Sequence, residues 1–218
     1  MLNQTLGVVL AIVGSYILGS IPTGYWYGRL RGIDIRKQGS GNLGATNVLR
    51  VLGKTAGVLV LSVDVAKGFL AVALLPHLTP FPGLDYVRVA CGLAAVLGHT
   101  YTLFLQFKGG KGVATTYGVL LALAPVSTIL VFLAFVAVVA FSKYVSLGSL
   151  VSAVLFPIFI WLLGESGQGF SILFLALVVG TAVVAKHRSN IRRILDGTEN
   201  RLGKSAAPGE KPKGGGQA

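Results

Sequence analysis

Long apolar runs separated by short basic blocks constrain this chain more than any other feature. A helix needs roughly 20 apolar residues to cross about 30 Å of hydrocarbon, and several runs reach that size. Apolar residues occupy 53% of the 218 positions, charged residues only 12%, and the mean hydropathy is +0.75. A water-soluble domain of this length could hardly bury so much apolar surface. The pattern therefore predicts an all-α fold, a polytopic membrane helix bundle.

Seven membrane-spanning helices are expected. The run 113–141 is too long for one crossing, and Pro125 near its middle predicts a turn between two shorter helices. No Lys or Arg precedes the first run and no Ala-x-Ala-like site follows it, so a retained helix is expected there. The predicted spans cover residues 6–27, 55–75, 87–107, the two halves of 113–141, 145–163 and 170–185.

The distribution of Lys and Arg predicts the orientation. The net charge of +12 comes from basic blocks between the apolar runs, which indicates topology signals rather than a nucleic-acid surface. With seven crossings, these blocks place the N-terminus outside and the C-terminus in the cytoplasm, and only Arg88 lies clearly outside. Residues 1–202 are expected to form the membrane domain, and residues 203–218 a basic, disordered cytoplasmic tail. The single Cys91 excludes a disulfide framework and a thiolate metal site.

The first cytoplasmic loop is rich in small polar residues. Glycines let backbone N–H groups approach an oxyanion, Ser and Asn add neutral donors, and the Arg fork suits phosphate. The same composition also fits a solvated turn, and it does not match Walker A. The segment comprises Gly39, Ser40, Gly41, Asn42, Leu43, Gly44, Ala45, Thr46 and Asn47, with Arg50 three residues beyond.

A second glycine-rich loop joins the third and fourth expected helices. Gly109, Gly110 and Gly112 flank Lys111, and a helix is expected to begin directly afterwards, with Thr115 in its first turn. Backbone donors, a helix N-terminus and an ammonium group could all bind one anion there. A tight hairpin whose lysines only enforce topology is the alternative.

Further polar residues lie within or beside the expected helices. Asp64 and Lys67 stand three apart, the spacing of a structural ion pair across one helical turn, although charges inside a membrane also indicate function. Ser146 and Ser149 begin the sixth helix and could simply bond their own backbone. His187, Asn190 and Arg193 follow the seventh helix, whereas His99 lacks the suitably spaced acid or second His that a metal site needs. No metal or cofactor is expected.

Taken together, these motifs resemble the PlsY family. The resemblance rests on Gly19-Ser20-Ile21-Pro22, the residue 39–50 loop, Asp64-x-x-Lys67-Gly68, the residue 109–115 loop and His187-Arg188-x-Asn190-Ile191, in matching order. It implies a seven-helix protein of the bacterial inner membrane that transfers an acyl group from acyl phosphate to the sn-1 hydroxyl of glycerol 3-phosphate. Lysophosphatidic acid and phosphate would be the products. The His-x-x-x-x-Asp signature of soluble-type acyltransferases is absent.

The resemblance also implies a site facing the cytoplasm. Its catalytic residues would be Ser40, Arg50, Lys111, one serine of the Ser146/Ser149 pair with Ser149 preferred, His187 and Asn190. Its substrate-binding residues would be Gly39, Gly41, Asn42, Gly44, Thr46, Asn47, Lys67, Gly109, Gly110, Gly112, Thr115 and Ser146. The expected partners are acyl phosphate, glycerol 3-phosphate and membrane lipid, without nucleic acid, and a monomer fits the sequence.

The residues themselves leave two questions open: which group accepts the proton, and whether the protein is an enzyme, a transporter or a scaffold. An acyl phosphate is already activated, so the enzyme must supply positioning, charge neutralisation and a destination for one proton. Either His187 or the departing phosphate could accept that proton. An organic-anion transporter is the main alternative function, although the inverted repeat expected of a carrier is not evident, and a noncatalytic scaffold would leave the polar loops unexplained.

Overall fold

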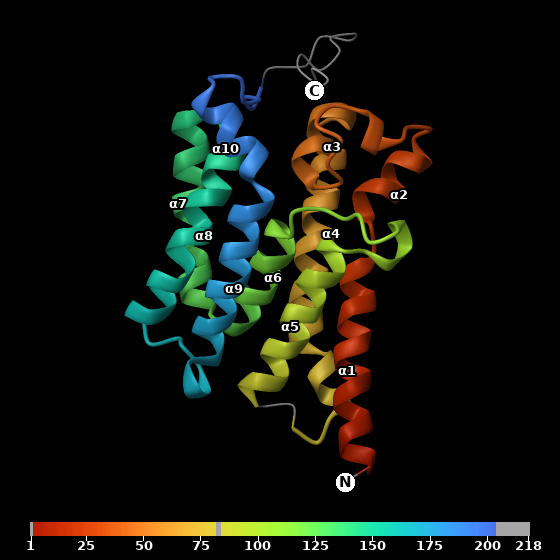
Figure 1. Cartoon of the computed structure of the whole chain (residues 1–218), viewed down its shortest axis with the longest axis vertical. Coiled ribbons are helices and arrows are strands. Elements are labelled where there is room, and N and C mark those ends of the chain that lie inside the picture. The colour runs from red at the N-terminus through yellow and green to blue at the C-terminus, as the bar shows by residue number, and fades with distance from the viewer. Residues whose placement is uncertain (1, 82–83, 204–218) are drawn as a thin grey trace, which may run out of the picture.

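A computed structural model describes residues 2–81 and 84–203 and shows helices without any strand in those ranges (Figure 1). The predicted tail, residues 203–218, lies outside the described residues except for Gly203. The α-helices are α1 (Leu2–Ser20), α2 (Thr23–Leu30), α3 (Ala45–Leu52), α4 (Lys54–Ala73), α5 (Asp85–Thr100), α6 (Val113–Leu123), α7 (Pro125–Ser142), α8 (Val145–Leu162), α9 (Ser171–Lys186) and α10 (Arg188–Leu195). Short 3₁₀ turns occur at Ile35–Lys37, Leu75–Leu78, Leu103–Leu105 and Gln168–Phe170.

The chain runs back and forth along the long axis of the molecule. It begins at one end in α1, while α10 and α3 both lie at the opposite end (Figure 1). Within the described residues, six helical segments are long and apolar enough to cross a membrane, and α6 is a shorter apolar helix. The all-α polytopic fold is therefore as predicted.

Pro125 divides the long apolar run as the sequence predicts. Helix α6 ends at Leu123, and α7 begins at Pro125 itself, where the missing N–H costs no helical hydrogen bond. The 11 residues of α6 span about 16 Å at 1.5 Å per residue, roughly half of the hydrocarbon thickness. Helix α6 therefore lies inside the bundle, reached through the loop that follows α5 (Figure 1).

The predicted first span, residues 6–27, lies within one candidate crossing, Gln4–Leu30, but its helix is interrupted at Pro22. Helix α1 ends at Ser20 and α2 starts at Thr23, because proline cannot donate the helical hydrogen bond and restricts the residue before it. The carbonyl oxygens released by this break find partners elsewhere. The Ser20 oxygen accepts from Thr102 Oγ1 at 2.5 Å, and the Ile21 oxygen accepts from Lys67 Nζ at 2.9 Å.

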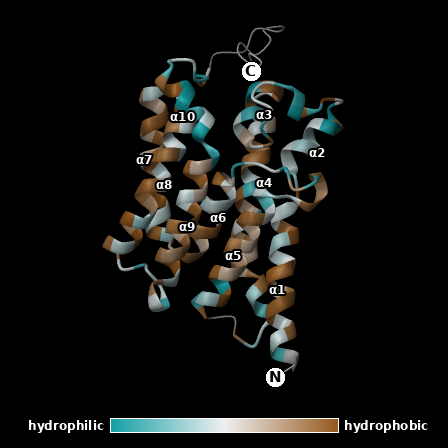
Figure 2. Ribbon diagram, viewed as in Figure 1, coloured by the Kyte–Doolittle hydropathy of each residue, from teal (hydrophilic) through white to brown (hydrophobic). Residues whose placement is uncertain are grey.

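The surface of the bundle is strongly apolar along its length. Large side chains such as Leu133, Phe174 and Trp161 are 58%, 63% and 62% exposed, which is costly in water and favourable in lipid. Hydrophilic segments gather in α2, α3 and α10 at one end (Figure 2). Polar chemistry is thus concentrated at that end.

Candidate active site

Five polar side chains converge between α6, α8 and α10. Lys111 Nζ donates to Asn190 Oδ1, and Asn190 Nδ2 donates to Glu199 Oε1 at 2.7 Å. Ser146 Oγ donates to the same Glu199 oxygen at 2.8 Å. Residues 79 positions apart therefore meet in one hydrogen-bonded group, which we call the Lys111 cluster: Lys111, Ser146, Asn190, Arg193 and Glu199.

Two arginines make the Lys111 cluster strongly cationic. Arg193 Nε donates to Glu199 Oε2 at 2.7 Å. Arg50, in the last turn of α3, is close enough for its pKa to respond to both residues: burial lowers that pKa, Glu199 raises it and Arg193 lowers it further. Three cations face one carboxylate, so the group has an excess of positive charge suited to phosphate.

His187 lies at the junction of α9 and α10 and is 3% exposed. Its Nδ1 lies 2.8 Å from the Val183 carbonyl oxygen, which can only accept, so Nδ1 carries the proton and Nε2 is an acceptor. Burial and the neighbouring Lys111 charge lower the pKa of His187 to about 4. An unperturbed imidazole titrates near 6.5, so His187 is a weaker base than usual and is neutral at pH 7.

The pKa of Lys111 is also lowered. Burial lowers the pKa of its ammonium to about 8, while Glu199 opposes the shift and Arg193 adds to it. Lys111 is thus mostly charged at pH 7 and loses its proton at a pH only slightly higher.

The two candidate serines have different surroundings. Ser146 bonds Glu199 in the Lys111 cluster, whereas Ser149 Oγ donates to the Val145 carbonyl of its own helix at 3.0 Å. Both side chains are buried. The residue preferred from sequence, Ser149, is therefore one turn from the cluster and outside its hydrogen bonds.

Asn47 organises the first glycine-rich loop from within. Its side chain is 2% exposed, its Oδ1 accepts from the Ser40 N–H at 2.8 Å, and its Nδ2 donates to the carbonyls of Ile35, Gln38 and Asn42. This amide is engaged in holding the loop, and the predicted role of Asn47 in substrate binding stays a prediction. Ser40 itself is exposed, with its hydroxyl free to turn toward a ligand.

Several glycine N–H groups already have acceptors. The N–H of Gly41 donates to Gln38 O, that of Gly44 to Asn42 Oδ1, and those of Gly109 and Gly110 to the carbonyls of Thr100 and His99. These four N–H groups are therefore engaged within the protein, and substrate binding by the four glycines stays a prediction. The glycines serve close packing, since a Cβ on Gly109 or Gly110 would overlap His99 and Thr100.

The remaining predicted residues lie near these loops with varied exposure. Gly39 and Gly112 have positive φ values of 57° and 80°, which favour glycine. Thr46 is half-buried on α3, and Thr115 is buried in α6 with a hydroxyl that has no hydrogen-bond partner among the described residues. Of the predicted catalytic residues, the structure brings Lys111 and Asn190 into contact and leaves Ser40 at the loop surface. His187 lies close enough to Lys111, and Arg50 close enough to Glu199 and Arg193, for their charges to interact.

Comparison with known proteins decides the family. The model of the family described as glycerol-3-phosphate acyltransferase matches residues 9–197. This chain belongs to the glycerol-3-phosphate acyltransferase family. The acyltransferases of Trichlorobacter lovleyi and Geobacter sulfurreducens are each 45% identical to it, over 88% and 93% of this chain and 95% and 99% of their own.

Solved structures agree with this assignment. The chain is 40% identical to PlsY, an integral membrane glycerol 3-phosphate acyltransferase, in its glycerol 3-phosphate form, with a TM-score of 0.84 over 90% of this chain and 96% of that one. The lysophosphatidic acid form gives a TM-score of 0.81. The protein is thus a membrane acyltransferase of this family, as its motifs suggest.

A second polar group lies in the middle of the acyltransferase. Lys67 Nζ is 2.8 Å from Asp64 Oδ1, each side chain is 3% exposed, and Thr23 Oγ1 donates to the same carboxylate oxygen at 3.2 Å. His99 Nδ1 lies 3.7 Å from Asp64. Because Lys67 also binds the Ile21 carbonyl at the α1–α2 break, this geometry favours the structural role and leaves its ammonium little room for substrate.

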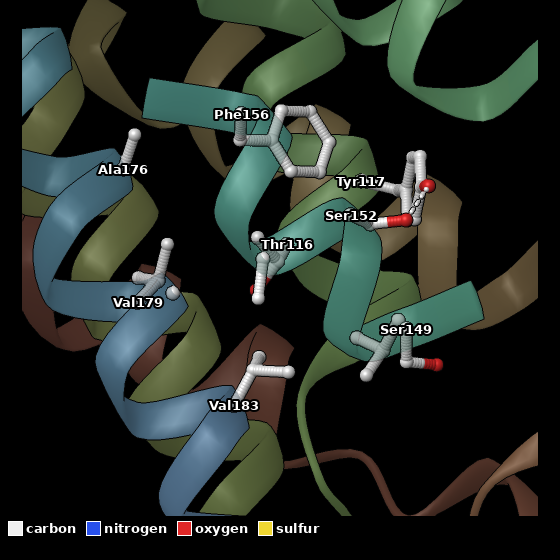
Figure 3. Close-up of a pocket in the computed structure, with 11 residues that line it drawn as sticks. Thr116, Tyr117, Ser149, Ser152, Phe156, Ala176, Val179 and Val183 are labelled. Carbon is white, nitrogen blue, oxygen red and sulfur yellow. Dashed lines mark hydrogen bonds between the residues drawn. The ribbon is translucent and has the colours of Figure 1, made fainter. Parts of the chain in front are cut away.

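A narrow apolar pocket of the acyltransferase lies between α6, α8 and α9 (Figure 3). Phe156, Val179 and Val183 form its walls, Ser149 lies at one edge, and Thr116 contributes a buried hydroxyl without a partner among the described residues. A water-sized sphere can enter only about 10 Å³ of it, so long chains could not be enclosed completely.

Glu199 is a site residue that the sequence motifs do not single out. Its side chain is 5% exposed and contacts Ser146, Asn190 and Arg193. One signal could have found it: the chain has only seven acidic residues, and Glu199 stands close in sequence to the basic residues Arg193 and Arg201. A carboxylate near several cations should be expected to pair with one of them.

Proposed function

We propose that this protein transfers a fatty acyl group from acyl phosphate to the sn-1 hydroxyl of glycerol 3-phosphate, giving lysophosphatidic acid and phosphate. The carrying observation is the convergence of Arg50, Lys111 and Arg193 with Asn190 and His187 at one end of a membrane helix bundle. Both substrates bear phosphate, and a site with excess positive charge can bind either of them. The solved relatives named as glycerol 3-phosphate and lysophosphatidic acid forms support the acceptor and the product.

The transfer needs no covalent enzyme intermediate. The glycerol hydroxyl oxygen attacks the acyl carbonyl carbon, a new ester bond forms, and the bond from that carbon to the phosphate oxygen breaks. The leaving phosphate has a second pKa of about 6 and can take the hydroxyl proton itself. A histidine whose pKa is about 4 is a poor base at neutral pH. His187 Nε2 is therefore better suited to orienting glycerol 3-phosphate by accepting a hydrogen bond from it.

Lys111 and Arg50 supply electrostatic stabilisation in this scheme. Negative charge builds up on the carbonyl oxygen and on the departing phosphate as the reaction proceeds, and fixed cations lower the energy of that state. The acyl chain would begin in the apolar pocket beside Ser149 and extend between helices toward lipid, since the pocket is too small to enclose it.

The donor can be tested directly. Purified protein in detergent should form lysophosphatidic acid and phosphate from acyl phosphate and glycerol 3-phosphate, and it should not use acyl-CoA. A Lys111→Ala variant prepared identically provides the control for contaminating activity. Comparable turnover with acyl-CoA, or no product with either donor, would refute the proposal.

We further propose that the site faces the cytoplasm of a bacterial inner membrane. The basic blocks that flank the spans favour this orientation. Single cysteines at Gln38 and Lys108, which are both exposed, in a Cys91→Ala background should react with an impermeant thiol reagent only from the cytoplasmic side. Labelling from outside in intact cells would reverse the assignment.

A further inference from the structure

The chain returns to the Lys111 cluster after α10. Thr198 N donates to Arg193 O at 2.8 Å as the chain turns at Gly197, whose φ is 68°. Leu202 N then donates to Lys143 O at 2.7 Å. These contacts hold residues 198–202 against the α7–α8 junction and direct the Glu199 side chain inward.

The Glu199 carboxylate is saturated by three donors from two helices. Ser146 Oγ and Asn190 Nδ2 share Oε1 at 2.8 and 2.7 Å, and Arg193 Nε binds Oε2 at 2.7 Å. Burial disfavours the charged form, but the hydrogen bonds from Asn190, Ser146 and Arg193 outweigh it and hold the pKa of Glu199 below its usual range. Glu199 is therefore ionised at neutral pH and can only accept hydrogen bonds.

This fixes the orientation of the Asn190 amide. A carboxylate can only accept and an ammonium can only donate, so a single orientation satisfies both neighbours: Nδ2 toward Glu199 and Oδ1 toward Lys111. If the Glu199 charge were removed, the amide could rotate and Lys111 would lose its fixed acceptor. The carboxylate thus determines where a predicted catalytic ammonium sits without touching it.

We propose that Glu199 is a positioning residue for acyl transfer, which orients Asn190 and Ser146 and, through Asn190, holds Lys111 in place for phosphate. The inference rests on the proposed function and extends it to a residue beyond position 197, where the family match ends. The opposite role is competition, in which an anion among three cations occupies the place of substrate phosphate. The two roles predict opposite changes on removing the charge.

Glu199→Gln and Glu199→Ala test these roles by steady-state kinetics with acyl phosphate and glycerol 3-phosphate. Positioning predicts that kcat/KM falls by about tenfold to 10²-fold in Glu199→Ala, because misplacing a reacting group by about 1 Å has effects of that size. Glu199→Gln, which keeps one acceptor oxygen, should lie between Glu199→Ala and wild type. A lower KM for glycerol 3-phosphate in either variant would instead identify competition and overturn the proposal.

Glu165 provides a matched control. Its carboxylate also binds three donors, the N–H groups of Val126 and Ser127 and the Ser127 hydroxyl, but it caps α7 at the other end of the molecule. Glu165→Gln should lower the unfolding temperature and leave kcat/KM of the folded fraction unchanged. Equal losses of kcat/KM in Glu165→Gln and Glu199→Gln would show that Glu199 acts only through stability, which would refute the inference.

A readout independent of activity separates the two proposals. Lys111 faces Glu199 and Arg193 from the C-terminal segment and His187 from the α9–α10 junction, and of these Glu199 alone favours its charged form. Glu199→Gln should therefore make Lys111 several-fold more reactive than in wild type toward an amine reagent at pH 8, measured by mass spectrometry against exposed Lys108. Unchanged reactivity of Lys111 in Glu199→Gln would refute the positioning role of Glu199. A wild-type protein that makes no lysophosphatidic acid would refute the proposed function alone.

Discussion

The two polar groups of this bundle differ in how their charges are matched. Asp64 and Lys67 form a closed pair in the middle of the bundle, and the lysine completes its hydrogen bonding with the Ile21 carbonyl. In the Lys111 cluster, Lys111 and Arg193, together with the neighbouring Arg50, outnumber the single carboxylate of Glu199 and leave unbalanced positive charge. A matched buried pair fixes structure, whereas an unmatched group near the membrane surface can bind an anion.

The largest expected effect is on stability, from breaking the closed pair. Asp64→Ala leaves the Lys67 charge buried without its partner, which should lower the free energy of unfolding by about 3–5 kcal/mol. Thermal unfolding in detergent measures this. The double variant Asp64→Asn/Lys67→Met removes both charges and should recover much of the loss, and a double variant no more stable than Asp64→Ala would contradict the ion-pair explanation.

Removing a cation at or beside the Lys111 cluster should instead lower the catalytic activity. Arg50→Ala and Lys111→Ala should each lower kcat/KM by on the order of 10²-fold, about 2.7 kcal/mol, because each removes a charge that stabilises phosphate. Their unfolding temperatures should stay close to wild type. Lys108→Ala, in the same loop as Lys111 but exposed, is the matched control and should retain full activity. Near-wild-type kinetics in Lys111→Ala would reduce that residue to a topology signal.

Variants of His187 test whether this residue acts by orienting the substrate or as a base. His187→Gln keeps an amide donor and acceptor but cannot act as a base, so we expect it to retain at least about fivefold more activity than His187→Ala. The wild-type kcat profile should also show no His187 ionisation between pH 6 and 7, since its pKa is about 4. An ionisation in that range that disappears in His187→Gln, with both variants equally inactive, would make His187 the general base.

The smallest effect concerns pH. Because burial lowers the pKa of Lys111 to about 8, its ammonium is present at neutral pH and is lost as pH rises through 8. The kcat/KM for glycerol 3-phosphate should therefore fall on the alkaline side of pH 8. Lys111→Arg keeps its charge throughout this range and should remove that fall, even if its activity at pH 7 is lower. An alkaline fall unchanged in Lys111→Arg would assign the ionisation to another group.

Apolar runs and proline determined most of the helices from the sequence alone. Hydrocarbon thickness fixes how long a spanning helix must be, and Pro125 ends α6 because proline cannot continue a helix without cost. The same rule applied to Pro22 would have predicted the α1–α2 break. That break was missed because the apolar run continues through it.

The sequence by itself determined the membrane fold, the family motifs and most of the polar residues that gather at one end, since composition and spacing act locally. Only the tertiary structure decided which donors remain available. It engages Asn47 and several glycine N–H groups inside the loops, lowers the pKa of His187 through burial, and brings Glu199 to Asn190. Hydrogen-bond partners and burial depend on contacts between residues far apart in the chain, and spacing along the sequence carries no direct record of them.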